Sequence, residues 1–176
     1  MKVLLVAVLL AVSLDAAAAS MPPPNFRESV RLTPIAEALS VPGAKVYCAL
    51  TPASWRDTVE PLYPGLRWAT LNGYAMVNEP AVYLSPWTCQ PLERWKRGKT
   101  VPLADVGRAL LTLGHESVHL RGVLDERTTE CTALKELRSV ARTHFGIKSA
   151  KVWRQVRDGA LDSHVLVLDA LAIPPC

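Results

Sequence analysis

The sequence predicts an α+β domain in which a small antiparallel sheet precedes two long helices. Three observations favour this class. The 176 residues are the length of one domain, and 49% apolar content is enough for one hydrophobic core. Residues 66–85 combine a turn signal with short runs of aromatic and β-branched residues, which is typical of strands. Residues 102–120 carry apolar side chains at spacings of three, four and seven, which is typical of an amphipathic helix.

Residues 1–19 have the composition of a secretory signal peptide. Lys2 precedes the apolar run 3–14, and the DAAAAS stretch that follows offers small side chains where a signal peptidase cuts. The run is shorter than the ~20 residues that a bilayer-spanning helix needs, so we expect no stable membrane insertion. Residues 20–176 are then expected as a single secreted, extracellular domain.

Four cysteines lie in the expected mature chain: Cys48, Cys89, Cys131 and Cys176. An even number of cysteines in an oxidising compartment predicts two disulfides, and four cysteines allow three pairings. We favour Cys48 with Cys89 and Cys131 with Cys176, because each pair then joins one half of the chain.

The charge balance is mildly basic, with a formal net charge of +4. A surplus of this size favours contact with anionic surfaces in general and identifies no partner. The densest basic stretch, ERWKRGKT at 93–100, contains a tryptophan. One short run without a nucleic-acid-binding motif is typical of a solvated helix end, so we expect no nucleic-acid partner.

The segment before the predicted long helix should contain one short helix and the sheet. Residues 27–43 have apolar spacing typical of a short helix that ends near Pro42 and Gly43. Asn72 and Gly73 separate two strand-like segments, which is a strong hairpin signal. Residues 81–85 (AVYLS) follow as a third strand.

The predicted helix over residues 102–120 is largely buried. Thr100 is a suitable N-cap, and Gly122 can end the helix in a left-handed conformation. Gly114 is unfavourable in a helix interior, so we expect another segment to approach the backbone closely there.

Two histidines in the last turns of this helix, His115 and His119, lie four residues apart. Positions i and i+4 share a helix face, so both rings can direct a nitrogen at one metal ion. Glu116 is rotated about 100° from His115 around the helix axis. It therefore lies beside the ion, where it can take a proton from a metal-activated water molecule. This HExxH pattern predicts a zinc (Zn2+) site with Glu116 as general base.

A second helix is expected after Asp125, which can act as its N-cap. Glu130 lies on the apolar face of that helix, where a buried carboxylate costs several kcal/mol unless a charge compensates it. A zinc ion would do so, and we predict Glu130 as the third ligand. Glu126, one turn earlier, is kept as the alternative, because the helix dipole explains an acid in the first turn without a metal.

The motif HESVH at 115–119, the turn at Gly122 and the segment DERTTEC at 125–131 together resemble the gluzincin branch of the zincin metallopeptidases, particularly small secreted members. The resemblance covers residues 82–142. It implies a zincin-like fold, a zinc ion bound by two histidines and a glutamate, and hydrolysis of peptide bonds in a peptide or protein substrate.

The same resemblance implies a strand along the cleft that pairs with extended substrate, and residues 81–85 are expected in that role. The position four residues after Glu130 is Leu134, where thermolysin-like enzymes keep an acid that orients a ligand histidine. That partner must therefore come from elsewhere, for example Asp125. The residue that stabilises the transition state is left unassigned.

A rival interpretation uses the spacing H-E-x-x-H-x-x-G-x-x-D, which is metzincin-like and makes Asp125 the third ligand. That branch needs a methionine turn beneath the metal, and the three methionines, Met1, Met21 and Met76, all precede the motif.

The alternative to an enzyme is a secreted, disulfide-bonded binding module in which the metal is structural or absent. The presence of Glu116 favours catalysis, because a structural two-histidine site has no need of an acid at that position. The sequence indicates neither the substrate nor the oligomeric state.

Overall fold

The computed structural model describes residues 22–65, 67–171 and 176, so the expected signal peptide lies outside the described residues. The described elements run in the following order: β1 (Phe26–Glu28), α1 (Thr33–Leu39), β2 (Lys45–Ala49), α2 (Pro52–Leu62), the 3-10 helix η1 (Trp68–Thr70), β3 (Gly73–Met76), β4 (Ala81–Leu84), α3 (Pro86–Lys96), α4 (Leu103–Leu120), α5 (Glu126–Phe145) and α6 (Ala150–Leu171).

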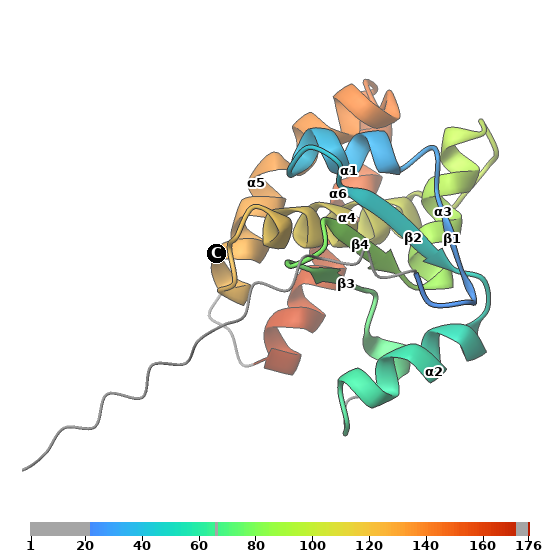
Figure 1. The fold of residues 1–176 in the computed structure, drawn as a ribbon. Helices are drawn as coiled ribbons and strands as arrows, with labels where there is room; N and C mark the ends of the chain where they lie inside the picture. Colours follow the sequence, from blue (N-terminus) through green and yellow to red (C-terminus); the bar gives the residue numbers. More distant parts are fainter. Residues whose placement is uncertain (1–21, 66, 172–175) are drawn as a thin grey trace, which may run out of the picture.

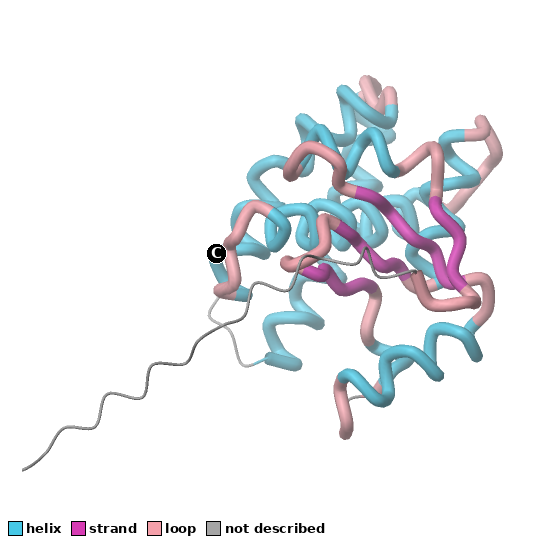
Figure 2. The backbone as a smooth tube through the Cα atoms, in the orientation of Figure 1, coloured by secondary structure: helices cyan, strands magenta, loops and turns pink. Residues whose placement is uncertain are grey.

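The α+β class is confirmed, but the sheet is mixed rather than antiparallel. Its strand order is β1-β2-β4-β3, and β3 forms one edge (Figure 2). β1 pairs with β2 and β3 pairs with β4 in antiparallel fashion, whereas β2 and β4 are parallel, with Val46 opposite Val82. Parallel neighbours need a crossover connection. Here the crossover consists of α2, η1 and β3, which lie between β2 and β4 along the chain. The hairpin signal at Asn72 and Gly73 did not predict this crossover.

The predicted hairpin is displaced along the chain. Asn72 and Gly73 do not form its turn: residues 68–70 are helical, β3 begins at Gly73, and the turn to β4 lies at residues 77–80. The Asn72 side chain instead accepts a hydrogen bond from the indole N–H of Trp87 at 2.9 Å. Asn72 therefore makes a tertiary contact with Trp87 and does not form the predicted turn.

The sheet separates two hydrophobic clusters, as the two-residue period of a strand requires. Val82 and Leu84 of β4 join the larger cluster together with residues of α4, α5 and α6. Ala81 and Tyr83 point to the opposite face and join a smaller aromatic cluster with α2. Figure 1 shows the same arrangement, with α4 crossing behind the sheet and α2 standing apart from the other helices.

α4 is held in place by a very close crossing with α6. A Cβ atom on Gly107 would lie 1.9 Å from the carbonyl oxygen of Val156, and one on Gly159 would lie 2.4 Å from the backbone of Ala104. Only glycine permits this approach, so the two helices pack backbone against backbone. The close contact predicted at Gly114 is less tight than these two, since a Cβ atom there would lie at an ordinary 3.7 Å from Ala133 of α5.

The ends of the helices differ partly from the predictions. The expected helix over 27–43 is shorter, because residues 26–28 pair as β1. α4 begins after Pro102 rather than after Thr100, and ends as predicted before Gly122, whose φ is 86°. Within the described part of the chain, no helix combines the length and the apolar character needed to cross a membrane.

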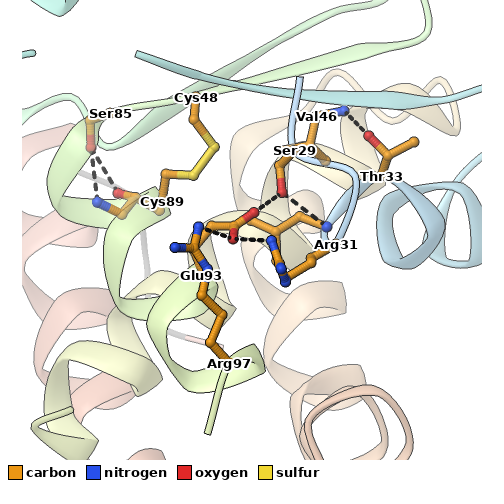
Figure 3. Close-up of a disulfide and its surroundings, with 11 residues drawn as sticks. Ser29, Arg31, Thr33, Val46, Cys48, Ser85, Cys89, Glu93 and Arg97 are labelled. Atoms are coloured by element: carbon orange, nitrogen blue, oxygen red, sulfur yellow. Dashed lines mark hydrogen bonds and ion pairs between the residues drawn. A yellow bond between two sulfur atoms is a disulfide. The ribbon is translucent and has the colours of Figure 1, made fainter. Parts of the chain in front are cut away.

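Both predicted disulfides are confirmed. Cys48 of β2 is bonded to Cys89 of α3 (Figure 3), and their Cα atoms are 5.8 Å apart. Cys131 of α5 is bonded to Cys176, with 5.5 Å between their Cα atoms. The second bond joins the helix that follows the histidine motif to the C-terminal residue.

A small ionic network lies next to the first disulfide (Figure 3). The carboxylate of Glu93 on α3 accepts a hydrogen bond from the buried hydroxyl of Ser29. Its second oxygen lies 3.3 Å from a guanidinium nitrogen of Arg31 and 2.9 Å from one of Arg97. These contacts tie the segment after β1 to α3.

Candidate metal centre

The two histidines of the motif face each other on α4. His115 and His119 are four residues apart on one helix face, and their ring centroids are 4.7 Å apart. The two Nε2 atoms are separated by 3.0 Å. Sequence spacing alone predicted this pair, because helix geometry fixes it.

A carboxylate from α5 completes the cluster. α4 ends at a tight turn around Gly122, and Asp125 caps α5 by accepting the backbone N–H of Thr128 at 2.8 Å. Glu126, the first residue of α5, then places one oxygen 3.1 Å from Nε2 of His115 and the other 3.4 Å from Nε2 of His119. The possible ligand atoms of these three residues all lie within 4.8 Å of one another.

The other ring nitrogens are held by acceptors. Nδ1–H of His115 donates to a carboxylate oxygen of Glu130 at 2.7 Å. Nδ1–H of His119 donates to the carbonyl oxygen of Val123 at 2.7 Å, and the Thr129 hydroxyl donates to the same carbonyl at 3.2 Å. A hydrogen bond at Nδ1 fixes the tautomer and the ring orientation, so both Nε2 atoms carry the free lone pair when the rings are neutral.

This donor set fits a divalent cation. Two lone pairs and a carboxylate that face one another within 3.4 Å repel unless a positive charge lies among them. A tetrahedral zinc ion with bonds of about 2.0–2.1 Å separates its ligand atoms by about 3.3 Å. The two Nε2 atoms are 3.0 Å apart, and the two oxygens of Glu126 approach one each, at 3.1 and 3.4 Å.

The cluster is open to solvent on one side. The side chains of His115 and His119 are 12% and 13% exposed, whereas that of Glu126 is 48% exposed. A closed structural zinc site has four protein ligands, but a catalytic site keeps one position for water or substrate. Among the described residues, three possible ligands converge, and the carboxylate among them is half-exposed.

Protons stabilise the cluster when no metal is bound. Burial lowers the pKa of His115, but hydrogen bonds to Glu126 and Glu130 outweigh burial and raise it to about 10. The pKa of His119 is also raised, since its contact with Glu126 outweighs burial. Hydrogen bonds from both rings lower the pKa of Glu126. The carboxylates around the two rings therefore stabilise positive charge at this site.

Glu116 lies beside the cluster and not among the converging ligand atoms. Its side chain is buried, with 7% exposure, and burial raises its pKa above the ordinary value. The positive charges of His115 and His119 act in the opposite direction. A carboxyl group whose pKa is raised is a stronger base than an exposed carboxylate, which suits it to accept and return a proton.

The first residue of the edge strand β3, Gly73, packs against the side chain of Glu116. A Cβ atom on Gly73 would lie 3.1 Å from Cγ of Glu116 and 3.0 Å from Cγ2 of Thr112. A larger residue here would have to displace these side chains by a few tenths of an ångström, so the close approach of the strand to α4 favours glycine. The expectation that residues 81–85 border the cleft as a substrate-pairing strand is wrong, because β4 is already paired on both sides, with β2 and with β3. Of the two strands of this hairpin, β3 is the one at an edge of the sheet.

Tyr63, at the end of α2, interacts electrostatically with the cluster, which the sequence did not reveal. The pKa of its phenol is raised by burial and also by the charges of Glu116 and Glu126, so its hydroxyl lies within the field of both carboxylates. Its ring contacts that of Tyr74 on β3, with centroids 6.4 Å apart. Tyr74 stacks on Tyr83, which stacks on Tyr47, so all four tyrosines form one row across the sheet. These interactions join residues that are distant in the sequence, so no short sequence motif predicts them.

The predicted site residues divide into two groups. His115, His119 and Glu116 lie as the motif predicts. Glu130 is buried on the inward face of α5, as predicted, but it contacts Nδ1 of His115 rather than the Nε2 side. The alternative, Glu126, faces both Nε2 atoms. Asp125 is engaged as the N-cap of α5, which accounts for it without a metal.

No protein-family model, curated protein or solved structure matches this chain. Its function must therefore be inferred from the chemistry of the site.

Proposed function

We propose that the protein is a secreted zinc-dependent peptidase. The observation that carries this proposal is the convergence of His115, His119 and Glu126 on one solvent-facing point, with the buried Glu116 beside it. Two disulfides are consistent with an oxidising, extracytoplasmic location.

The proposed ligands are His115, His119 and Glu126, so Glu126 replaces the initially predicted Glu130. Glu130 instead orients His115 through Nδ1. A carboxylate behind a ligand histidine raises the basicity of the ring and fixes its direction. This is the role that the gluzincin resemblance requires of an acid four residues after the glutamate ligand, and Glu130 follows Glu126 by four.

Zinc bound there would act as a Lewis acid that lowers the pKa of a water molecule and polarises the substrate carbonyl. Glu116 accepts one proton from the attacking water as the new C–O bond forms. It returns that proton to the amide nitrogen as the C–N bond breaks, which leaves a carboxylic acid and an amine. The Tyr63 hydroxyl donates a hydrogen bond to the oxygen on which negative charge develops.

The substrate in this proposal is an extended peptide segment. β3 is an edge strand whose outer side can take another strand, and main-chain hydrogen bonds of that kind are independent of sequence. Because Gly73 at the start of β3 packs on Glu116, a peptide paired with this edge runs past the proton acceptor.

The alternative, a binding module with a structural metal, is less well supported. Glu126 is 48% exposed, and three possible ligands converge among the described residues, whereas a structural tetrahedral site has four. A buried carboxyl group beside the cluster also has a destabilising desolvation cost that a structural site has no need to bear.

The test uses zinc-loaded full-length mature chain and an unfolded protein substrate. We expect about one zinc per chain and measurable cleavage. Glu116→Gln should retain zinc while cleavage falls by about 10²–10⁴-fold, as expected for removal of a general base. Glu136→Gln, an exposed carboxylate on α5 that pairs with Arg121, is the matched control and should retain activity. Zinc binding without any cleavage would support the binding module instead.

A further inference from the structure

A groove with a volume of about 430 Å³ lies between α3 and α4. It is lined by polar, charged and aromatic side chains, which include Asn72, Trp87, Arg94, Asp105, Arg108 and Thr112. None of these residues belongs to the candidate metal centre.

The groove lies one helical turn from Glu116 along α4. Thr112 lines it and precedes Glu116 by four residues, so the two side chains share one face of α4. Both also contact the position of Gly73, where the free edge of β3 begins. Asn72, the residue before that edge, lines the groove as well. A peptide paired with β3 would start beside Asn72 and Thr112, two residues that line the groove.

The charges in the groove favour an anion. Asp105 is paired with Arg108, and Arg94 donates one hydrogen bond, of 3.3 Å, to the carbonyl of Thr100. Two arginines and one aspartate leave an excess of one positive charge among the lining residues. Each guanidinium has five N–H donors, and within the described part of the chain each makes one hydrogen bond to a single acceptor. Donors therefore remain that match the fork of a carboxylate.

We propose that this groove is a specificity subsite that binds a carboxylate group of the peptide substrate through Arg94 and Arg108. The inference rests on the proposed peptidase function and adds the class of substrate: acidic peptides. It also gives a role to Arg94 of the basic stretch at 93–100. Only Arg94 of that stretch lines the groove, whereas Arg97 is paired with Glu93.

The experiment compares pools of unstructured peptides that carry Glu or Gln at each position in turn, with the C-terminus either free or amidated. Cleavage by the zinc-loaded protein is followed by mass spectrometry. We expect the Glu peptides to be cleaved about 10-fold faster than the Gln peptides when the acid occupies one fixed position relative to the cut bond. A preference that follows the free C-terminus instead would identify the terminal carboxylate as the bound group.

Three variants localise the effect. Arg94→Gln and Arg108→Gln should each reduce the preference to about 2-fold or less. Lys99→Gln is the matched control, because it removes the same charge from the same segment outside the groove, and it should keep the preference. Equal cleavage of Glu and Gln peptides, or an equal loss in Lys99→Gln, would overturn the subsite while leaving the peptidase proposal intact.

A complete lack of cleavage would count against the peptidase proposal, and the subsite is then judged by binding. The same pools are titrated against zinc-loaded Glu116→Gln protein and followed by tryptophan fluorescence, since Trp87 lines the groove. Tighter binding of acidic peptides that is lost in Arg94→Gln supports the subsite. Equal binding of both pools rejects it.

Discussion

Nδ1 of His115 lies 2.7 Å from a carboxylate oxygen of Glu130, while Nε2 of the same ring faces Glu126 at 3.1 Å. One histidine therefore joins two glutamates of α5 through its two nitrogens. The two carboxylates differ in burial, with side-chain exposures of 2% for Glu130 and 48% for Glu126. The exposed one faces the candidate metal position and the buried one supports the ring.

This relationship predicts different effects of the two glutamates on zinc affinity. Glu126→Ala removes a proposed ligand and should leave the purified chain without stoichiometric zinc, as His115→Ala and His119→Ala should. Glu130→Gln removes only the orienting charge, so affinity should fall by about 10–100-fold. Competition with a chromophoric chelator measures both. Asp125→Asn is the control. A larger loss with Glu130→Gln than with Glu126→Ala would restore Glu130 as the third ligand.

A methyl group at Gly73 should impair catalysis without affecting the metal. The Cβ of Gly73→Ala would press on Cγ of Glu116 at 3.1 Å and on Thr112 at 3.0 Å, so the proton acceptor must shift. Small displacements of reacting groups are costly, and we expect kcat/KM to fall about 10-fold with one zinc retained. Gly114→Ala is the matched control next to His115, since its Cβ would make an ordinary 3.7 Å contact with Ala133. Equal activities of the two variants would contradict this account of β3.

Removal of the Tyr63 hydroxyl should lower kcat more than it changes KM. Tyr63→Phe retains the ring contact with Tyr74 and loses only the O–H group, which interacts electrostatically with Glu116 and Glu126. Loss of one donor to a developing oxyanion costs about 10²–10³-fold in kcat. Tyr47→Phe, at the other end of the tyrosine row, is the control and should be unaffected. If both variants behave like wild type, Tyr63 has no part in catalysis.

The network around Glu93 should make the fold sensitive to acid. Burial raises the pKa of Glu93, but hydrogen bonds from Ser29 and Arg97 outweigh burial and hold it below the ordinary value of 4.5. A carboxyl group whose pKa is lower in the folded chain stabilises the fold above about pH 4.5, and this contribution is lost as pH falls through the folded-state pKa.

Glu93→Gln should therefore reduce the free energy of unfolding by about 1–2 kcal/mol at pH 7, and the difference from wild type should shrink at pH 3. Urea unfolding at the two pH values measures it. Glu136→Gln, which breaks only an exposed pair with Arg121, should cost less than about 0.5 kcal/mol at pH 7. A pH-independent cost of Glu93→Gln would show that its charge is irrelevant to stability.

The sequence by itself determined the features that depend on a few consecutive residues. His115 and His119 share a face because an α-helix turns once every 3.6 residues, and Gly122 ends α4 because it tolerates a positive φ of 86°. These inferences needed no knowledge of how distant segments pack. The disulfide pairing was only favoured among three possibilities, and the structure confirmed it.

Only the tertiary structure decided which glutamate faces the Nε2 atoms. Glu126 and Glu130 are four residues apart and lie on the same face of α5, so helix periodicity cannot distinguish them. The position of α5 relative to α4 along that face distinguishes them. The same holds for β3 as the free edge and for Tyr63 beside Glu116, because strand order and contacts between elements arise from burial of apolar area across the whole chain. Such packing is a sum over distant residues, and no short stretch of sequence records it.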